Sequence, residues 1–279
     1  MRTFWRRFVT SRAALIGAAI LSLIVLVAAT APMAFPGSPF RQVGRPFLAP
    51  FGEHLFGTDQ LGRDVAAGVA HGARTSLMIG VLATAVAVLL GTLVGGCAGY
   101  YGGSTDDVLM RSTEFFQTIP TFLFVIVLVA IITPSIKSIV VAIAVVSWPP
   151  VARLVRGEFL TLRSRDFVQA CVGLGMSDGR VIFRHLLPNC LSPIVVTGSL
   201  IVATAILIES ALSFLGLGDP NTMSWGFMIG AGRTFLRSAW WLCTIPGVAI
   251  LLTVLAINLL GEGLNDALNP RLGKSPRAG

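Results

Sequence analysis

The chain of 279 residues is apolar and poor in charge, which separates it from ordinary soluble proteins. Hydrophobic residues make up 54% of the sequence and charged residues 12%, whereas a soluble domain has about 25% charged residues. The 21 Lys and Arg exceed the 13 Asp and Glu, but they lie in short segments between apolar runs and form no platform with interleaved aromatic residues. The composition therefore predicts an all-α polytopic membrane protein with lipid around it, and it argues against nucleic acid as a partner.

Six uncharged runs predict six transmembrane helices. They cover residues 13–31, 76–98, 118–135, 138–152, 190–208 and 242–260. The first run follows several arginines, as in a signal peptide, but its nineteen residues exceed the usual apolar region of about 7–15 residues and favour a retained helix. The fourth run is the weakest, because it is short and contains Pro149 and Pro150.

The distribution of Lys and Arg predicts how the chain is oriented. With six spans, fourteen of these residues fall on the side that holds both termini and seven on the other. Both termini are therefore expected in the cytoplasm. The chain then divides into a cytoplasmic segment (1–12), a first span with a long external loop (13–75), a transmembrane core (76–262) that includes a cytoplasmic loop (153–189), and a cytoplasmic tail (263–279).

A stripe of glycines marks one face of the second span. Gly91, Gly95, Gly99 and Gly103 recur at every fourth residue, so two helix backbones can approach closely along this face. We expect packing against another helix of the same chain, with an interface between subunits as the alternative. Gly102 and Gly103 are also expected to end the helix.

Residues 165–189 hold the most informative motif of the sequence. Phe167, Ala170, Cys171 and Leu174 fall at positions i, i+3, i+4 and i+7 and predict one apolar face on a short helix. A short amphipathic helix in a cytoplasmic loop must dock against something. Gly175 is expected to stop it in a left-handed conformation.

The chain after this helix completes the motif. Ser177 is expected to cap a second helix, and Pro188 is expected to interrupt the helix before the fifth span. The pattern of Gln169 to Cys171, Gly175 and Pro188 resembles the EAA loop of ABC importer permeases, whose helix sits in a cleft of a cytoplasmic ATPase subunit. The resemblance implies that the following residues couple the chain to an ATPase: Phe167, Gln169, Ala170, Cys171, Leu174, Gly175, Arg184 and His185. The sequence departs from the family at Gln169, which is usually Glu, and at Cys171, which is usually Ala.

Further motifs resemble the C-type permease subunits of dipeptide, oligopeptide and nickel importers. The matching segments are Phe56–Asp64, His71–Leu77, Gly99–Gly103, Met110-Arg111, Ser147-Trp148, Ala152-Arg153, Glu209–Gly218, Ser224–Gly226, Trp240-Trp241, Pro246-Gly247 and Asn269–Arg271. The resemblance implies the type I ABC importer permease fold in a bacterial inner membrane. It also implies a heterodimer with a B-type permease, two ATPase subunits and an external solute-binding protein. Peptides are the expected cargo, and nickel, haem-like compounds or other small solutes are the alternatives.

For two groups of residues at the predicted external face, the sequence leaves alternative roles open. Thr58, Asp59, Arg63 and Asp64 either belong to a docking surface or only build turns with local ion pairs. Glu209, with Ser213, lies at the outer end of the fifth span and either lines the pathway or caps a turn. Trp225 is a further candidate of the external loop or the pathway.

ATP and Mg are expected on partner subunits and no cofactor on this chain, which is not expected to be an enzyme. Gly273 to Ser275 imitate the end of a phosphate-binding loop, but residue 268 is Leu where the first glycine is needed, and Pro276 blocks the helix that should follow. The cysteines and histidines lack the spacing of metal ligands. An ion-coupled secondary transporter is the alternative class, but such proteins normally keep ionisable residues in the middle of the membrane.

Overall fold

Long apolar helices form most of the chain in the computed structural model, which describes residues 8–268. The elements are α2 (Arg12–Ala34), α3 (Val65–Tyr101), α4 (Gly103–Thr118), α5 (Thr121–Ile132), α6 (Ile136–Arg163), α7 (Asp166–Gly173), α8 (Asp178–Val181), the π turn η1 (Ile182–Leu186), α9 (Leu187–Phe214), α10 (Trp225–Gly232), the 3-10 turn η2 (Arg233–Phe235) and α11 (Trp241–Leu268). In the part of the chain that the structure describes, extended pairing is limited to isolated bridges in the 35–64 loop. The all-α prediction is confirmed.

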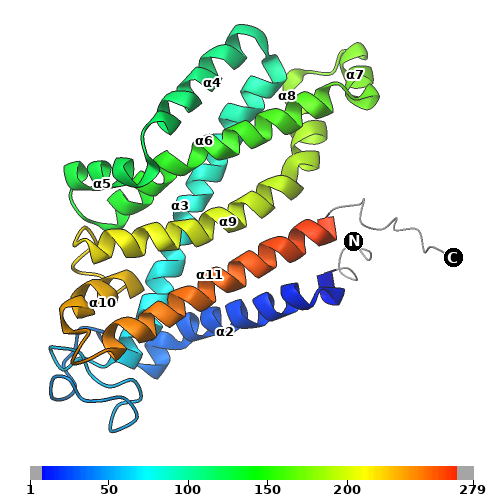
Figure 1. Ribbon diagram of the computed structural model, residues 1–279. Helices are drawn as coiled ribbons and strands as arrows, with labels where there is room; N and C mark the ends of the chain where they lie inside the picture. Colours follow the sequence, from blue (N-terminus) through cyan, green and yellow to red (C-terminus); the bar gives the residue numbers. More distant parts are fainter. Residues whose placement is uncertain (1–7, 269–279) are drawn as a thin grey trace.

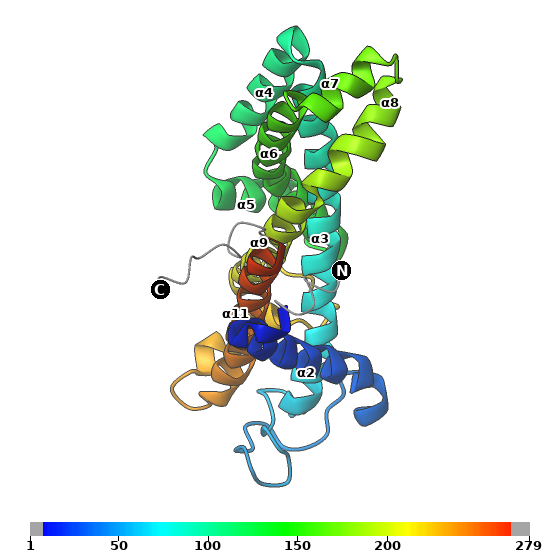
Figure 2. The ribbon, with the colours of Figure 1, turned by 90° about the vertical axis from the view of Figure 1, so that its right-hand side faces the viewer.

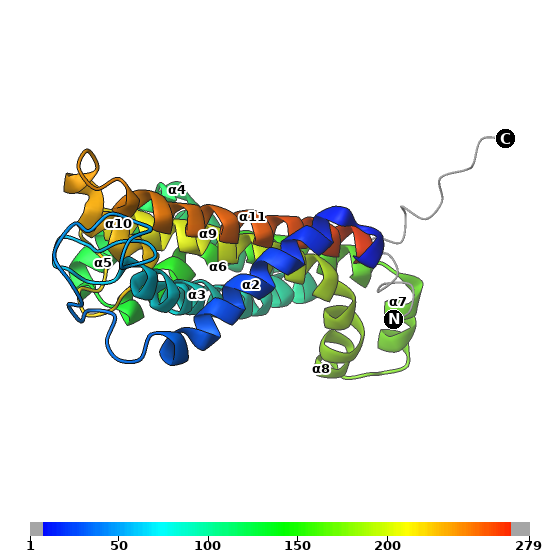
Figure 3. The same ribbon diagram turned by 90° about the horizontal axis from the view of Figure 1, so that it is seen from below.

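The helices form an elongated bundle with two distinct ends. Figure 1 shows α7 and α8 at the same end as the start of α2 and the end of α11, and we call this the α7 end. The 35–64 loop and α10 lie at the opposite end, which we call the α10 end, and the view from below agrees (Figure 3). Seen along the bundle, α6, α9, α11 and α2 follow one another in a row, and α3 crosses beside them (Figure 2). Helix α3 packs on all four.

Five helical stretches are long and apolar enough to cross a membrane. They are Arg12–Ala34, Val65–Tyr101, Ile136–Arg163, Asp178–Phe214 and Trp241–Ala267. They contain five of the six predicted spans, and each is longer than the apolar run that predicted it. The fourth predicted span, the weakest in the sequence, is the core of α6, which continues through Pro149 and Pro150.

The third predicted span, 118–135, is wrong as a single straight helix. Its apolar residues form α5, which has 12 residues and a length of about 18 Å, short of the roughly 30 Å of a bilayer core. Helix α4 precedes it at an angle of 86°. Ile119, with extended backbone, and Pro120 stand between the two helices, and Pro120 supplies no N–H for a continuous helix. Only the bent pair together can count as a sixth span.

The predicted cytoplasmic loop 153–189 is helical over most of its length, because α6 continues to Arg163 and α8 joins α9 through the π turn. Pro188 does not interrupt the helix, contrary to the sequence prediction. It lies in the first turn of α9, where the amide hydrogen it lacks is least needed. In the wider turn before it, the amide of Leu187 donates to the carbonyl of Ile182.

The glycine stripe packs α3 against α6 of the same chain, as predicted. A Cβ added at Gly91 would lie 2.7 Å from the Trp148 carbonyl oxygen, and one at Gly95 would overlap the carbonyl of Ala152. Helix α3 ends at Tyr101 and Gly102 follows with a φ of 69°, so the predicted helix end is also confirmed. Gly103 makes no such contact and begins α4.

Candidate functional site

Helix α7 leaves most of its apolar face uncovered. Phe167 is 45% exposed and Leu174, at the end of the helix, is 84% exposed. Ala170 lies between them and is also exposed. Such exposure is unusual for side chains of this kind in an aqueous segment and marks a surface suited to a partner. Three of the four residues predicted to share one apolar face therefore point away from the bundle.

The other side of α7 packs on the rest of the chain. Val168 is 1% exposed and Cys171 is half-buried, and both belong to an apolar cluster that includes Val155 and Phe159 of α6. Cys171 therefore differs from the prediction that it belongs to the exposed face. Sequence spacing alone did not reveal that this short helix has apolar side chains on two faces.

Gly175 supplies the turn that the sequence predicted. Its φ is 72°, in the left-handed region, and no neighbouring atom restricts the space around it. Glycine is therefore required for its backbone conformation and not for close packing. Gln169 is exposed on α7. Ser177 stands at the N-cap of α8, but its side chain makes no capping hydrogen bond.

The remaining two coupling candidates lie apart from α7, in the π turn. Arg184 is exposed, whereas His185 is half-buried and its Nε2 atom has no hydrogen-bond partner. The Asn189 side chain donates to the His185 carbonyl oxygen at 2.6 Å. Within residues 8–268, no three His, Cys, Asp or Glu side chains come together as metal ligands.

Two polar contacts at the α7 half of the bundle were not anticipated from the sequence. The Arg156 guanidinium donates two hydrogen bonds to the Asp106 carboxylate, at 2.5 and 2.6 Å, and ties α6 to α4. The Tyr100 hydroxyl donates to Asp178 Oδ1 at 2.8 Å and ties the end of α3 to the start of α8. Fifty and 78 residues separate the partners, so no local pattern reveals these pairs.

At the α10 end, Thr58 and Asp59 build the 35–64 loop. The Thr58 hydroxyl is fully buried, donates to the Arg45 carbonyl and accepts from the Leu48 amide. Asp59 Oδ1 accepts from the amides of Leu61 and Arg63, both at 2.8 Å. These contacts correspond to the turn-building alternative left open by the sequence.

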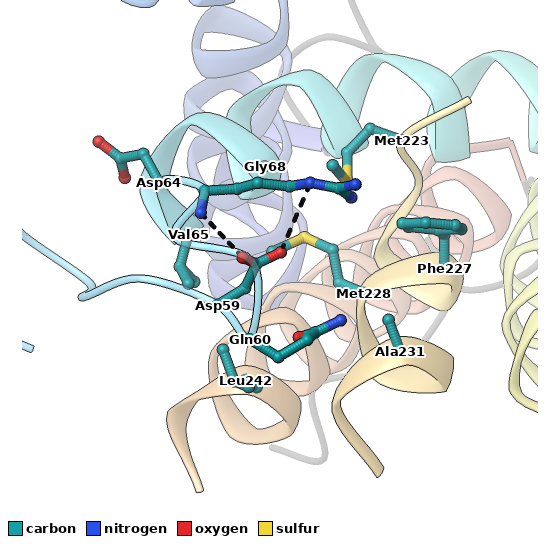
Figure 4. Close-up of a pocket in the computed structure, with 11 residues that line it drawn as sticks. Asp59, Gln60, Asp64, Val65, Gly68, Met223, Phe227, Met228, Ala231 and Leu242 are labelled. Atoms are coloured by element: carbon teal, nitrogen blue, oxygen red, sulfur yellow. Dashed lines mark hydrogen bonds and ion pairs between the residues drawn. The ribbon is translucent and has the colours of Figure 1, made fainter. Parts of the chain in front are cut away.

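Asp64 and Arg63 continue this arrangement toward α3. Asp64 caps α3 by accepting from the Ala66 amide at 2.7 Å, and its second oxygen lies 3.3 Å from His54 Nδ1. The Arg63 guanidinium lies 4.9 Å above the Phe40 ring. A cavity of about 20 Å³ beside Asp59 (Figure 4) has room for a water molecule but for no larger solute.

Glu209 is buried among hydroxyl groups and does not face an open surface. Its side chain is 1% exposed. The hydroxyls of Ser213 and Ser224 donate to its Oε1 at 2.9 and 2.7 Å, while Oε2 has no hydrogen-bond partner. Ser224 also caps α10 by accepting from the Phe227 amide at 3.0 Å. The carboxylate therefore joins the C-terminal part of α9 to the start of α10.

Trp225, the first residue of α10, fixes that helix to α3. It is 1% exposed and the largest of the fully buried side chains among the described residues. Its indole Nε1 donates to the Val69 carbonyl at 3.0 Å, and its backbone amide donates to the Ser76 hydroxyl at 3.3 Å. Gly72 leaves room for the ring, because a Cβ there would lie 3.0 Å from it.

Comparison with known proteins identifies the family. Residues 87–274 match the family described as binding-protein-dependent transport system inner membrane component, and residues 1–53 match the N-terminal transmembrane domain of oligopeptide transport permease C. The chain is 39% identical over 274 residues to a dipeptide transport system permease protein of Alkalihalophilus pseudofirmus, covering 97% of this chain and 90% of the relative. It is 42% identical over 269 residues to a putative peptide transport system permease protein of Brucella suis, covering 96% and 90%.

The fold has known relatives as well. The permease chain in an inward-facing structure of the MetNI methionine ABC transporter superposes with a TM-score of 0.59 at 15% identity, covering 72% of this chain and 96% of that chain. At this identity the likeness shows the fold alone, which is that of type I ABC importer permeases. The chain thus belongs to the family of inner membrane components of binding-protein-dependent transport systems.

Proposed function

We propose that this chain is the C-type transmembrane subunit of an ATP-driven importer of peptides, in which α7 receives the movement of a cytoplasmic ATPase subunit. The observation that carries this proposal is the exposed apolar surface of Phe167, Ala170 and Leu174 on a helix that is anchored from its other side. Relatives at about 40% identity that are named peptide permeases support the cargo.

The orientation follows from charge. The side that carries the α7 end holds the larger share of the Lys and Arg residues, and by the positive-inside rule this supports a cytoplasmic position for the α7 end. The α10 end then faces outward, where an external solute-binding protein delivers the cargo. The multi-pass chain lies in a bacterial inner membrane with both termini inside.

The rest of the transporter consists of other chains. A B-type permease completes the pathway, and two ATPase subunits bind ATP with Mg. The present chain supplies half of the wall and a docking helix but performs no hydrolysis itself.

The test is to place a charge in the docking surface. Ala170→Arg should abolish co-purification of the ATPase subunits and uptake of radiolabelled di- and tripeptides, because the new guanidinium would be buried in the interface without a partner. Thr161→Arg adds the same charge at an exposed position of α6 and should leave both measurements near the wild-type level. Normal assembly and uptake with Ala170→Arg would contradict the docking assignment.

Import that needs no ATP would contradict the proposal as a whole. Uptake in vesicles that hold the assembled transporter should require ATP on the ATPase side and persist with an uncoupler. Uptake by the purified chain alone, driven by an imposed ion gradient, would favour a secondary transporter instead.

A further inference from the structure

Three segments of the chain meet at Tyr100, in the last turn of α3. The side chain is 8% exposed. Its hydroxyl donates to Asp178 Oδ1 at 2.8 Å, and the Arg163 guanidinium carbon lies 6.0 Å from the centre of its ring. Arg163 ends α6 and Asp178 begins α8, so one side chain of α3 is hydrogen-bonded to one of these helix ends and lies within cation-π range of the other.

These two helix ends enclose the segment that contains α7. Arg163 immediately precedes residues 164–177 and Asp178 immediately follows them. Both ends of the segment, hereafter the coupling segment, therefore converge on Tyr100. No other described residue outside the segment has polar or cation-π contacts with both of its flanking residues.

Helix α7 packs on the bundle through one of its sides only. Val168 is buried and Cys171 is half-buried against the α6 cluster, whereas the other residues of α7 are exposed. A hollow of about 400 Å³ opens beside it, lined by Tyr100, Arg163, Val168 and Asp178 among others. A helix held through one side only can tilt on its flanking turns, so fixing its two ends makes the transmission of its movement more direct.

Helix α3 is well placed to receive that force. It packs on α2, α6, α9 and α11, whereas α7 is joined through the chain only to α6 and, by way of α8 and the π turn, to α9 (Figure 2). Without a contact at Tyr100, movement of α7 would reach α3 only indirectly through α6 and α9. The hydrogen bond to Asp178 supplies a direct link at the end of α3.

We propose that Tyr100 is a positioning residue that clamps both ends of the coupling segment to α3, so that movement of α7 is transmitted to α3 as well as to α6 and α9. This inference rests on the proposed function. It also predicts the reverse path, because the coupling between two sites is reciprocal: docking at the external face reaches the ATPases through the same contact.

The experiment removes only the hydroxyl, with Tyr100→Phe in the transporter assembled with its own partners. Co-purification of the ATPases and the thermal midpoint should stay near wild type. Peptides moved per ATP, and the stimulation of ATP hydrolysis by the loaded binding protein, should both fall about fivefold, which corresponds to the roughly 1 kcal/mol of one hydrogen bond. Tyr101→Phe is the matched control, because Tyr101 is 52% exposed and keeps its ring; it should change neither quantity.

Variants of Asp178 test whether its hydrogen bond with Tyr100 transmits movement or only stabilises the fold. Asp178→Asn keeps an oxygen that accepts the hydrogen bond and should retain nearly full coupling, whereas Asp178→Ala should resemble Tyr100→Phe. Combining Tyr100→Phe with Asp178→Ala should add no further loss, since both remove the same bond.

Failure of the clamp and failure of the proposed function have different signatures. If Ala170→Arg abolishes assembly but Tyr100→Phe leaves transport per ATP and stimulated hydrolysis unchanged, α7 docks and the clamp is wrong. Should Ala170→Arg leave assembly intact, both proposals fall. If the wild-type transporter moves none of the di- and tripeptides, the cargo assignment fails, and the stimulation of hydrolysis by the binding protein still decides for or against the clamp.

Discussion

The motif residues Thr58, Glu209 and Trp225 at the α10 end differ from the motif residues Ala170 and Leu174 on α7 in their exposure to solvent. At the α10 end, Thr58, Glu209 and Trp225 are buried and bonded to their own chain. On α7, the apolar side chains of Ala170 and Leu174 are exposed. Residues that recur in family motifs thus have two different tasks. Those at the α10 end build the chain itself, and those on α7 are available to a partner.

The strongest test of this contrast is Trp225→Ala. Removing a fully buried indole should lower the free energy of unfolding by about 3–5 kcal/mol, because a cavity forms between α10 and α3 and the Val69 carbonyl loses its partner. Thermal unfolding of the purified chain in detergent measures the effect. Trp240→Ala is the control, since that side chain is 52% exposed, and its effect should stay within about 0.5 kcal/mol. If the two variants lost equal amounts of unfolding free energy, burial in the structure would not distinguish residues that stabilise the chain at the α10 end from residues that do not.

A smaller loss is expected at the seam between α3 and α6, which joins the two ends. Gly95→Ala would press a methyl group against the backbone of Ala152 and should cost about 1–3 kcal/mol of stability, because backbone atoms cannot move aside as a side chain can. Gly157→Ala is the control within α6, where no atom lies near the added group; there the alanine should stabilise the helix slightly. If Gly95→Ala unfolded no more easily than Gly157→Ala, the glycine stripe would have to serve another purpose, such as an interface between subunits.

Local patterns in the sequence predicted most of the helices, because apolar runs and glycine spacing act over one or two turns. The span at 118–135 failed for a reason that hydropathy does not report: Pro120 permits a bend of 86° inside an apolar stretch. The prediction for Pro188 was wrong in the opposite sense, because a π turn accommodates a proline that was expected to interrupt the helix. In both cases backbone hydrogen bonding decided the outcome.

The candidate sites show the same division between local and distant information. The turn at Gly175 and the cap at Asp64 depend on neighbours in sequence, and the first of these was predicted outright. Tyr100 and its partner Asp178 are 78 residues apart, and Glu209 and its second partner Ser224 are 15 residues apart; only the packing of α3 and α10 brings these residues together. The motif at 165–174 indicated an apolar face but not that Cys171 would face the bundle.

The smallest expected effect concerns Glu209, whose carboxylate organises the start of α10. Glu209→Ala leaves the hydroxyls of Ser213 and Ser224 without their shared acceptor in a buried site, which should cost about 1–2 kcal/mol of unfolding free energy. Glu209→Gln keeps an oxygen at the position of Oε1 and can offer its amide group at the position of Oε2, which has no partner in the native side chain. Its stability should therefore lie closer to wild type.

Thermal unfolding of the chain in detergent measures the stability of both variants, and peptide uptake by the assembled transporter is the second measurement. If Glu209 serves only to hold α10, stability and uptake should fall together for Ala and recover together for Gln. Wild-type stability combined with lost uptake in Glu209→Gln would instead assign the negative charge a role in transport, and the α10 end could no longer be described as purely structural.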